Sequence, residues 1–206
     1  GTFDAYADAK FNVTRNQDEN DYFIYNADQP IVVAYAEKSK AQKVPFTTKG
    51  RTDVGASADA DAIYWNGEKI AERKDIVLPG QHNVENILCA VAASMLLGCE
   101  VSAMTQVLAT FGGVRHRTQF VREWQGRRIY NDSKATNCLA TKSAIEAFDA
   151  PLVLLAGGLD RGHSFEELRE AMKNVRVSIS FGETGMRFAE FAKSCGVEEA
   201  IVAVNV

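Results

Sequence analysis

Pro151-Leu152-Val153-Leu154-Leu155-Ala156 is an uninterrupted apolar run, and Gly157-Gly158 follow it directly. A short run of this kind that ends at turn residues predicts a buried strand of a parallel sheet. Downstream, the pattern predicts a helix near 165–173, a strand near 175–181, a helix near 186–195 and a strand near 200–204. Strands that alternate with helices predict parallel β-α-β units, so the expected fold class is α/β.

Upstream of this run, helix and strand patterns also alternate. The predicted helices cover 5–15, a short segment from Pro30, 83–97 and 138–148, and a strand is predicted over 21–26. Hairpins are predicted over 62–73, around Asn66-Gly67, and over 119–130, around Gln125-Gly126. A domain boundary is predicted near Gly112-Gly113, which divides the chain into parts 1–113 and 114–206.

The composition is that of an ordinary globular protein. Of 206 residues, 46% are hydrophobic and 24% charged, and the net charge of −4 with scattered Lys and Arg argues against a nucleic-acid partner. We expect no membrane segment and a cytoplasmic location, because no apolar run of membrane-spanning length and no signal-peptide pattern is found. The four cysteines form no C-x-x-C pair, and we expect reduced, mostly buried thiols: Cys89, Cys99, Cys138 and Cys195.

The segment richest in chemical groups is Asn131-Asp132-Ser133-Lys134-Ala135-Thr136-Asn137, between a predicted strand and a predicted helix. Loops that leave the carboxyl ends of strands are where α/β proteins place ligands. Asp132 supplies a carboxylate, Lys134 a positive charge, and Ser133 and Thr136 hydroxyl groups, which suit a phosphoryl group. The alternative is a helix-capping cluster, since the same residue types are preferred at N-caps.

Three further segments carry polar groups beside turns. In Leu78–Asn86, the spacing of Asn83 and Asn86 places both on one face of a helix start, although Asn83 could equally be a cap. In Phe111–Arg117, the guanidinium of Arg117 suits phosphate oxygens, and His116 is interpreted as structural. The segment 157–164 nearly fits the phosphate-loop pattern, but His163 stands where its lysine should be, so a tight turn is predicted.

Taken together, these segments resemble the Mur ligase family in its order along the chain, and Asn131–Asn137 resembles the motif of the branch that adds D-glutamate. The resemblance implies the latter part of a central ATPase domain over 1–113 and the start of a Rossmann-like, amino-acid-binding C-terminal domain over 114–206. It also implies an ATP-dependent amide ligase that joins D-glutamate to UDP-N-acetylmuramoyl-L-alanine through an acyl phosphate, in peptidoglycan precursor synthesis.

The resemblance further implies roles for individual residues. Tyr6–Lys10 is similar to a family helix whose lysine is carbamylated, so Lys10 would be catalytic and would hold Mg²⁺ as its carbamate. ATP would be bound by Asn83, Asn86, Arg117 and Asp132. The catalytic Lys134, together with Thr136 and Arg161, would face the incoming amino acid or the reacting phosphate.

The resemblance covers the chain, but the chain does not cover the family. We expect both ends to be cuts in a longer protein, which would leave out the N-terminal domain, the Gly-Lys-Thr phosphate loop and the end of the C-terminal domain. The fragment alone is then expected to be inactive, and it is expected to be monomeric. The alternatives are another Mur or folylpolyglutamate-type ligase, against which the loop 131–137 argues, and a non-catalytic nucleotide-binding module.

Overall fold

The computed structural model describes residues 2–204, which fall into two compact units. The first unit takes in 1–78 and 82–111, and the second takes in 79–81 and 112–206. The predicted boundary at residue 113 lies close to this division. The ATP-binding and amino-acid-binding roles of the two parts stay predictions.

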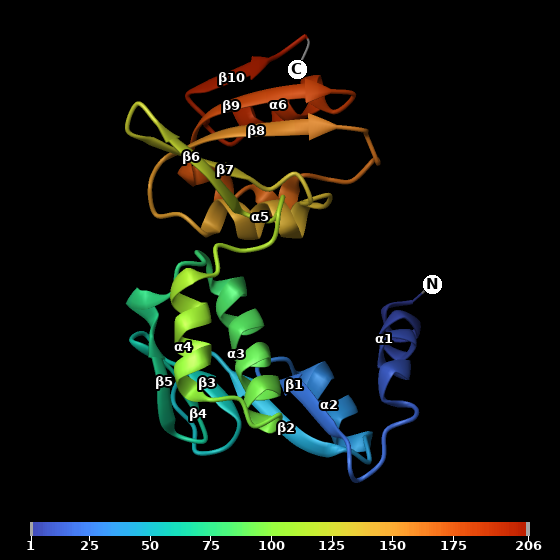
Figure 1. Cartoon of the computed structure of the whole chain (residues 1–206). Coiled ribbons are helices and arrows are strands. Elements are labelled where there is room, and N and C mark those ends of the chain that lie inside the picture. Colours follow the sequence, from blue (N-terminus) through green and yellow to red (C-terminus); the bar gives the residue numbers. More distant parts are fainter. Residues whose placement is uncertain (1, 205–206) are drawn as a thin grey trace. The chain divides into compact units, whose positions relative to one another are not determined.

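The first unit is built on a five-stranded mixed sheet in the order β1-β2-β3-β4-β5 (Figure 1). The strands are β1 Tyr22–Asn26, β2 Gln42–Thr47, β3 Ala56–Ala58, β4 Ala62–Trp65 and β5 Glu68–Glu72. The pairs β1–β2 and β2–β3 are parallel, and the pairs β3–β4 and β4–β5 are antiparallel. The predicted hairpin is confirmed: Asn66 and Gly67 both have positive φ, 46° and 80°, as a tight primed turn requires.

The described residues of the first unit also form four α-helices. They are α1 Phe3–Phe11, α2 Pro30–Lys38, α3 Gln81–Leu96 and α4 Val101–Thr110, with short 3-10 turns η1 Asn12–Thr14 and η2 Arg73–Asp75. On α3, Val84, Leu88 and Val91 are buried and share one core with sheet residues such as Phe46 and Ile63. The amphipathic helix predicted over 83–97 is therefore present.

The second unit contains a hairpin and a small parallel sheet (Figure 1). The hairpin pairs β6 Gln119–Trp124 with β7 Arg127–Asn131, and the sheet has the order β10-β9-β8, with β8 Leu152–Gly158, β9 Val175–Gly182 and β10 Glu199–Val202. The helices are α5 Cys138–Glu146 and α6 Gly185–Ser194, with 3-10 turns η3 Glu166–Leu168 and η4 Ala171–Asn174. The parallel α/β class predicted from the sequence is thus observed.

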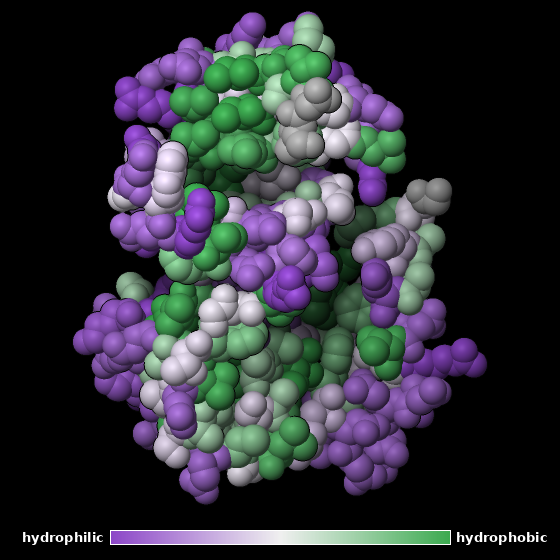
Figure 2. Space-filling model, turned by 45° about the horizontal axis from the view of Figure 1, so that its top comes forward, coloured by the Kyte–Doolittle hydropathy of each residue, from purple (hydrophilic) through white to green (hydrophobic). Residues whose placement is uncertain are grey.

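The helices of the second unit cover only one face of its sheet. Leu152 and Leu154 of β8 pack on the core that contains Ile145 and Phe188. The alternate side chains point the other way and are exposed: Val153 by 54%, Leu155 by 61% and, on β10, Ile201 by 46%. Figure 2 shows apolar surface gathered on this unit. The run 151–156 is therefore a strand, but it is not buried on both faces.

Two other expectations are wrong. The segment 165–173 does not form one α-helix but the two 3-10 turns η3 and η4, whose residues Leu168, Ala171 and Met172 are buried. The thiols are free, as expected, but they are not mostly buried: Cys89 and Cys99 are exposed, and Cys138 and Cys195 are half-buried. Among the helices of residues 2–204, none has the length and apolar character needed to cross a membrane.

Candidate functional site

The loop after β7 is tied to the turn before β6 through Asp132. Its Oδ1 accepts a hydrogen bond of 2.8 Å from the backbone N–H of Thr118. Thr118 is buried and has a φ of 41°, a left-handed conformation that a threonine adopts only under constraint. The Asp132 carboxylate therefore holds this turn in place with one of its two oxygens.

A second set of contacts joins the same two segments. The backbone N–H of Lys134 donates to the carbonyl of His116 over 3.1 Å, and Nδ2 of Asn131 lies 3.1 Å from Nδ1 of His116. The N–H of His116, whose φ is 66°, donates to Oε1 of Gln119 over 3.0 Å. These bonds fix the segment that carries Arg117 against the loop that carries Lys134. They agree with the interpretation of His116 as structural.

Three of the side chains predicted to meet ligands in this unit are exposed and unpaired, whereas Asp132 is half-buried and bonded to Thr118. Among residues 2–204, the side chains of Arg117, Lys134 and Thr136 make no hydrogen bond or ion pair. Asn137, by contrast, caps α5, because its Oδ1 accepts from the N–H of Ala140 over 2.8 Å. The capping alternative therefore accounts for Asn137 and leaves the charged groups of the loop available for a ligand.

Arg161 lies in a second loop, between the end of β8 and η3, and is exposed. No side chain or backbone group of the described residues pairs with its guanidinium. The loop is an extended segment and not the tight turn that was predicted, and within it Asp160 Oδ1 accepts a hydrogen bond from the N–H of Gly162 over 2.8 Å. At its start the two strands approach so closely that a Cβ on Gly157 would lie 2.1 Å from the carbonyl oxygen of Phe181. The loop of Arg161 leaves the carboxyl end of β8, a strand of the parallel sheet, which suits a ligand site, whereas the loop 131–137 follows β7 of the antiparallel hairpin.

In the first unit, Asn83 and Asn86 lie together at the start of α3. Nδ2 of Asn86 is 3.4 Å from Oδ1 of Asn83, so both side chains share one face of the helix, as their spacing predicts. Lys10 is exposed on α1, with its Nζ 5.5 Å from the ring centroid of Tyr6. In the described part of the chain, no group of three or more His, Cys, Asp or Glu side chains is arranged to hold a metal ion.

Asp28, Thr47 and Thr48 form a polar cluster at the carboxyl ends of β1 and β2, and they are hydrogen-bonded to one another. The Asp28 carboxylate accepts hydrogen bonds from the N–H of Thr48, over 2.8 Å, and from the hydroxyls of Thr47 and Thr48. Burial raises the pKa of Asp28, but these hydrogen bonds lower it more, so the pKa lies below its ordinary value. This carboxylate stabilises the loop after β2, and we assign it no ligand.

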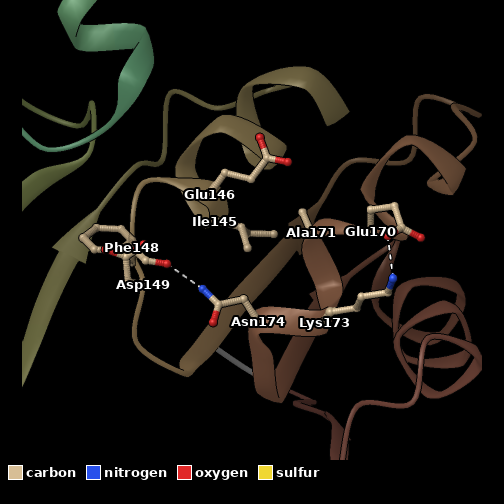
Figure 3. Close-up of a pocket in the computed structure, with 8 residues that line it drawn as sticks. All are labelled: Ile145, Glu146, Phe148, Asp149, Glu170, Ala171, Lys173 and Asn174. Carbon is tan, nitrogen blue, oxygen red and sulfur yellow. Dashed lines mark hydrogen bonds and ion pairs between the residues drawn. The ribbon is translucent and has the colours of Figure 1, made fainter. Parts of the chain in front are cut away.

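A pocket in the second unit lies away from the predicted site residues (Figure 3). It is lined by Ile145, Glu146, Phe148, Asp149, Glu170, Ala171, Lys173 and Asn174. Its polar groups are partly paired, since Asn174 Nδ2 donates to the carbonyl of Phe148 and Lys173 pairs with Glu170. It adjoins the beginning of β9 at Val175, whereas ligands of α/β sheets bind beyond the strands' carboxyl ends. We assign it no function.

Several residues that shape the site were not predicted from the sequence. Thr118 contacts Asp132, 14 residues away, and Gln119 contacts His116, three residues away, and no periodicity or motif marks either contact. Arg187 was missed for the same reason, although it contacts the loop of Arg161 from the first turn of α6. A charged residue within an apolar helix pattern is the one signal that the sequence offered for it.

Comparisons with known proteins agree with the fold and with the loop sequences. Residues 1–94 match the model of the Mur ligase middle domain. Over its whole length the chain is 50% identical to a UDP-N-acetylmuramoylalanine–D-glutamate ligase of Geobacillus kaustophilus and 46% identical to one of Halalkalibacterium halodurans, and it covers 46% of each. The chain thus spans about half the length of the curated relatives it matches.

Solved structures show the same fold at low sequence identity. The UDP-N-acetylmuramate-alanine ligase MurC of Thermotoga maritima superposes with a TM-score of 0.71 at 18% identity, covering 98% of this chain and 47% of that one. A MurF of Acinetobacter baumannii gives 0.70 at 14% identity, with the same two coverages. From the fold, the motif loops and these matches together, the chain belongs to the Mur ligase family.

Proposed function

We propose that the protein carrying this chain joins D-glutamate to UDP-N-acetylmuramoyl-L-alanine at the expense of ATP. The observation that supports this most is the identity of 50%, over the full length of the chain, to a relative that is named for this reaction. The loop Asn131–Asn137 adds support, because its free cation and hydroxyl groups stand at the carboxyl end of β7.

The proposed reaction has two steps. The carboxylate of UDP-N-acetylmuramoyl-L-alanine attacks the γ-phosphate of ATP and gives an acyl phosphate and ADP. The amine of D-glutamate then attacks the activated carbonyl, phosphate leaves, and the amine loses a proton. Activation is needed because a carboxylate oxygen is a poor leaving group. The protein contributes mainly by holding the reactants in place and by neutralising charge.

The residue roles follow from charge and availability. Lys134 and Thr136 would contact the transferred phosphate or the incoming amino acid, and the exposed Arg161 would pair with a carboxylate of D-glutamate. Arg117 would bind phosphate oxygens through its planar fork. One oxygen of Asp132 is already engaged by Thr118, so its contribution to nucleotide binding would come from Oδ2. Asn83 and Asn86 would add amide contacts to the nucleotide.

Magnesium is the metal that the family implies, and Lys10 is the residue that we propose as a ligand after carbamylation. The described residues do not complete a site for it, because an unmodified ammonium group cannot ligate a cation and no acidic cluster accompanies Lys10. Mg²⁺ requires about six oxygen ligands. The proposed steps are therefore assigned only to the side chains that this chain supplies.

The wider proposal is a cytoplasmic, monomeric ligase with no nucleic-acid or membrane partner, in which the 206-residue chain alone is inactive. The first alternative is another Mur or folylpolyglutamate-type ligase, which would add a different amine. The chain also superposes on structures of a MurF and of a folylpolyglutamate synthetase. A non-catalytic nucleotide-binding module is the alternative from a different class of protein.

The test is phosphate release by the full-length protein with ATP, Mg²⁺ and UDP-N-acetylmuramoyl-L-alanine, with D-glutamate or L-lysine as the amine. We expect release that depends on D-glutamate and falls by roughly 100-fold or more in Lys134→Ala, as when a charge-stabilising group is removed. Lys142→Ala is the matched control, because Lys142 lies on α5 and, within residues 2–204, forms an ion pair with Glu146 alone, over 3.8 Å. Release with L-lysine instead would assign the protein to a sister ligase, and no release with either amine would favour the binding module.

A further inference from the structure

The loop that carries Arg161 is held from both sides of that residue. Before it, the N–H of Asp160 donates to Oε2 of Glu183 over 3.1 Å. After it, the N–H of Gly162, whose φ is 70°, donates to Oδ1 of Asp160 over 2.8 Å. Arg161 itself is exposed, with no partner for its guanidinium among residues 2–204. A fixed loop with one free cation is an arrangement that presents this cation to a ligand.

Arg187 of α6 makes the contacts that close this loop. Its Nη2 donates to Oδ1 of Asp160 over 2.6 Å, and its Nη1 donates to the carbonyl oxygen of His163 over 2.9 Å. One planar guanidinium therefore bridges the residue before Arg161 and the residue two positions after it. Its Nε is buried and has no hydrogen-bond partner in the described part of the chain. Both of the polar contacts of this side chain are thus used to hold the loop.

The helix that carries Arg187 is itself firmly anchored. The Cζ of Arg187 lies 4.4 Å from the ring centroid of Phe165. Phe165 in turn packs edge-on against Phe188, with a centroid separation of 5.1 Å. Phe188 and Ala192 of α6 are buried in the core of the second unit, against β8 and β9 (Figure 1). The position of the loop is therefore set by the core through α6, and Arg187 is the connection between them.

We propose that Arg187 is a positioning residue, which acts through Arg161 by holding the loop 159–163 so that the Arg161 guanidinium meets a carboxylate of the amino-acid substrate. The proposal rests on the proposed function, in which Arg161 binds D-glutamate. An isolated surface ion pair would have little effect. Here one side chain restrains a loop at two points, and a loop that moves by about 1 Å can misplace a ligand-binding group.

The test compares steady-state kinetics of variants of the full-length ligase. Arg187→Met keeps an unbranched apolar stem but ends near the position of Nε, so it removes the guanidinium and with it both hydrogen bonds. We expect the KM for D-glutamate to rise about tenfold, while kcat at saturating D-glutamate stays within about twofold and the KM for ATP is unchanged, since a binding contact is lost that is common to the ground and transition states. Arg187→Lys keeps the charge but reaches only one acceptor, and should fall between wild type and Arg187→Met.

Two further variants separate positioning from general destabilisation. Arg161→Met should raise the KM for D-glutamate at least as much, and the double variant Arg161→Met/Arg187→Met should be no worse than Arg161→Met alone, because residues that act through one another are not additive. The matched control is Arg176→Met, which removes an exposed arginine from β9 whose partner is Glu198, 2.8 Å away. It should leave all three kinetic constants unchanged.

The outcomes distinguish this proposal from the proposed function. An unchanged KM for D-glutamate in Arg187→Met, or parallel changes in kcat and in the KM for ATP, would overturn the positioning role while the ligase assignment stands. Full additivity in the double variant would show that Arg187 does not act through Arg161. If the wild-type protein fails to use D-glutamate at all, the proposed function falls, and the positioning role falls with it.

Discussion

The close approach of β8 and β9 at Gly157 gives a sharp prediction about stability. Gly157 pairs with Phe181 in the parallel ladder, and a Cβ on Gly157 would lie 2.1 Å from the carbonyl oxygen of Phe181 and 2.8 Å from its carbonyl carbon and its nitrogen. These are backbone atoms, so no side chain can turn aside. Gly157→Ala therefore forces the two strands apart by about 0.9 Å, since Cβ contacts below 3.0 Å are essentially never found.

The size of the effect follows from what this separation disrupts. Neighbouring strands lie about 4.8 Å apart, so such a shift breaks hydrogen bonds at this end of the ladder. Overpacking costs about 1–3 kcal/mol, and each lost hydrogen bond adds about 1 kcal/mol. We expect Gly157→Ala to lower the free energy of unfolding of the second unit by roughly 3 kcal/mol.

The measurement is urea unfolding of the chain combined with hydrogen exchange of the amides of β8 and β9. Gly112→Ala is the matched control, because a Cβ at Gly112 meets no atom within 4 Å and its φ is not in the left-handed region. It should change the stability by less than about 0.5 kcal/mol. A loss below 1 kcal/mol in Gly157→Ala, or protection of β8 and β9 equal to that of the control, would refute this reasoning.

Three more predictions concern single side chains. Asp132→Ala leaves the buried N–H of Thr118 without its acceptor, so the free energy of unfolding in urea should fall by about 1–3 kcal/mol. An unchanged midpoint would contradict a stabilising role for this hydrogen bond. The pKa of Asp28 is lower in the folded state than its unfolded value of 3.8. The carboxylate therefore stabilises the fold above pH 3.8, and this contribution is lost as the pH falls through the lower, folded pKa. The free energy of unfolding of Asp28→Asn should be about 2 kcal/mol below that of wild type at pH 7, and the difference should shrink toward about pH 3. Burial raises the pKa of the Cys138 thiol, which also donates to a carbonyl over 3.2 Å, so iodoacetamide should modify Cys138 more slowly at pH 8 than the exposed Cys99, as mass spectrometry of the peptides would show.

The sequence was sufficient for elements with strong local signals. Both hairpins were predicted from their turns, and the residues at these turns adopt positive φ as expected: Asn66, Gly67, Gln125 and Gly126. The helix α3 and the strand β9 were predicted from the alternation of helix and strand patterns along the chain. The family motif located the loop 131–137 between β7 and α5, where it is found.

Other elements lack such signals. The strand β2 contains Pro45, which argues against a strand inside a sheet, and β3 consists of Ala56-Ser57-Ala58, whose residues have little strand propensity. The segment 165–173 has buried residues three and four apart, a spacing that a helix and successive 3-10 turns share. Leu88 and Val91 lie on the buried face of α3, and Cys89 lies on the face turned away from it, so Cys89 is exposed. The residue type alone does not show this.

The candidate site divides in the same way. Its proposed ligand-binding groups were singled out because a motif places charges and hydroxyls next to one another in the sequence, and their roles stay predictions. Two of the groups that hold them, Thr118 and Arg187, depend on contacts between segments far apart in the chain. Such contacts are a property of the folded molecule and have no periodicity of their own.

The open face of the small parallel sheet has a practical consequence for anyone who handles this chain. Val153 and Leu155 on β8 and Ile201 on β10 expose hydrocarbon to solvent on either side of β9, and β8 and β10 are the outer strands of the sheet that the structure describes. Surfaces and strand edges of this kind adhere to copies of themselves. A concentrated sample should therefore be lost to aggregation, seen as turbidity and dye binding, at temperatures below those at which the chain unfolds.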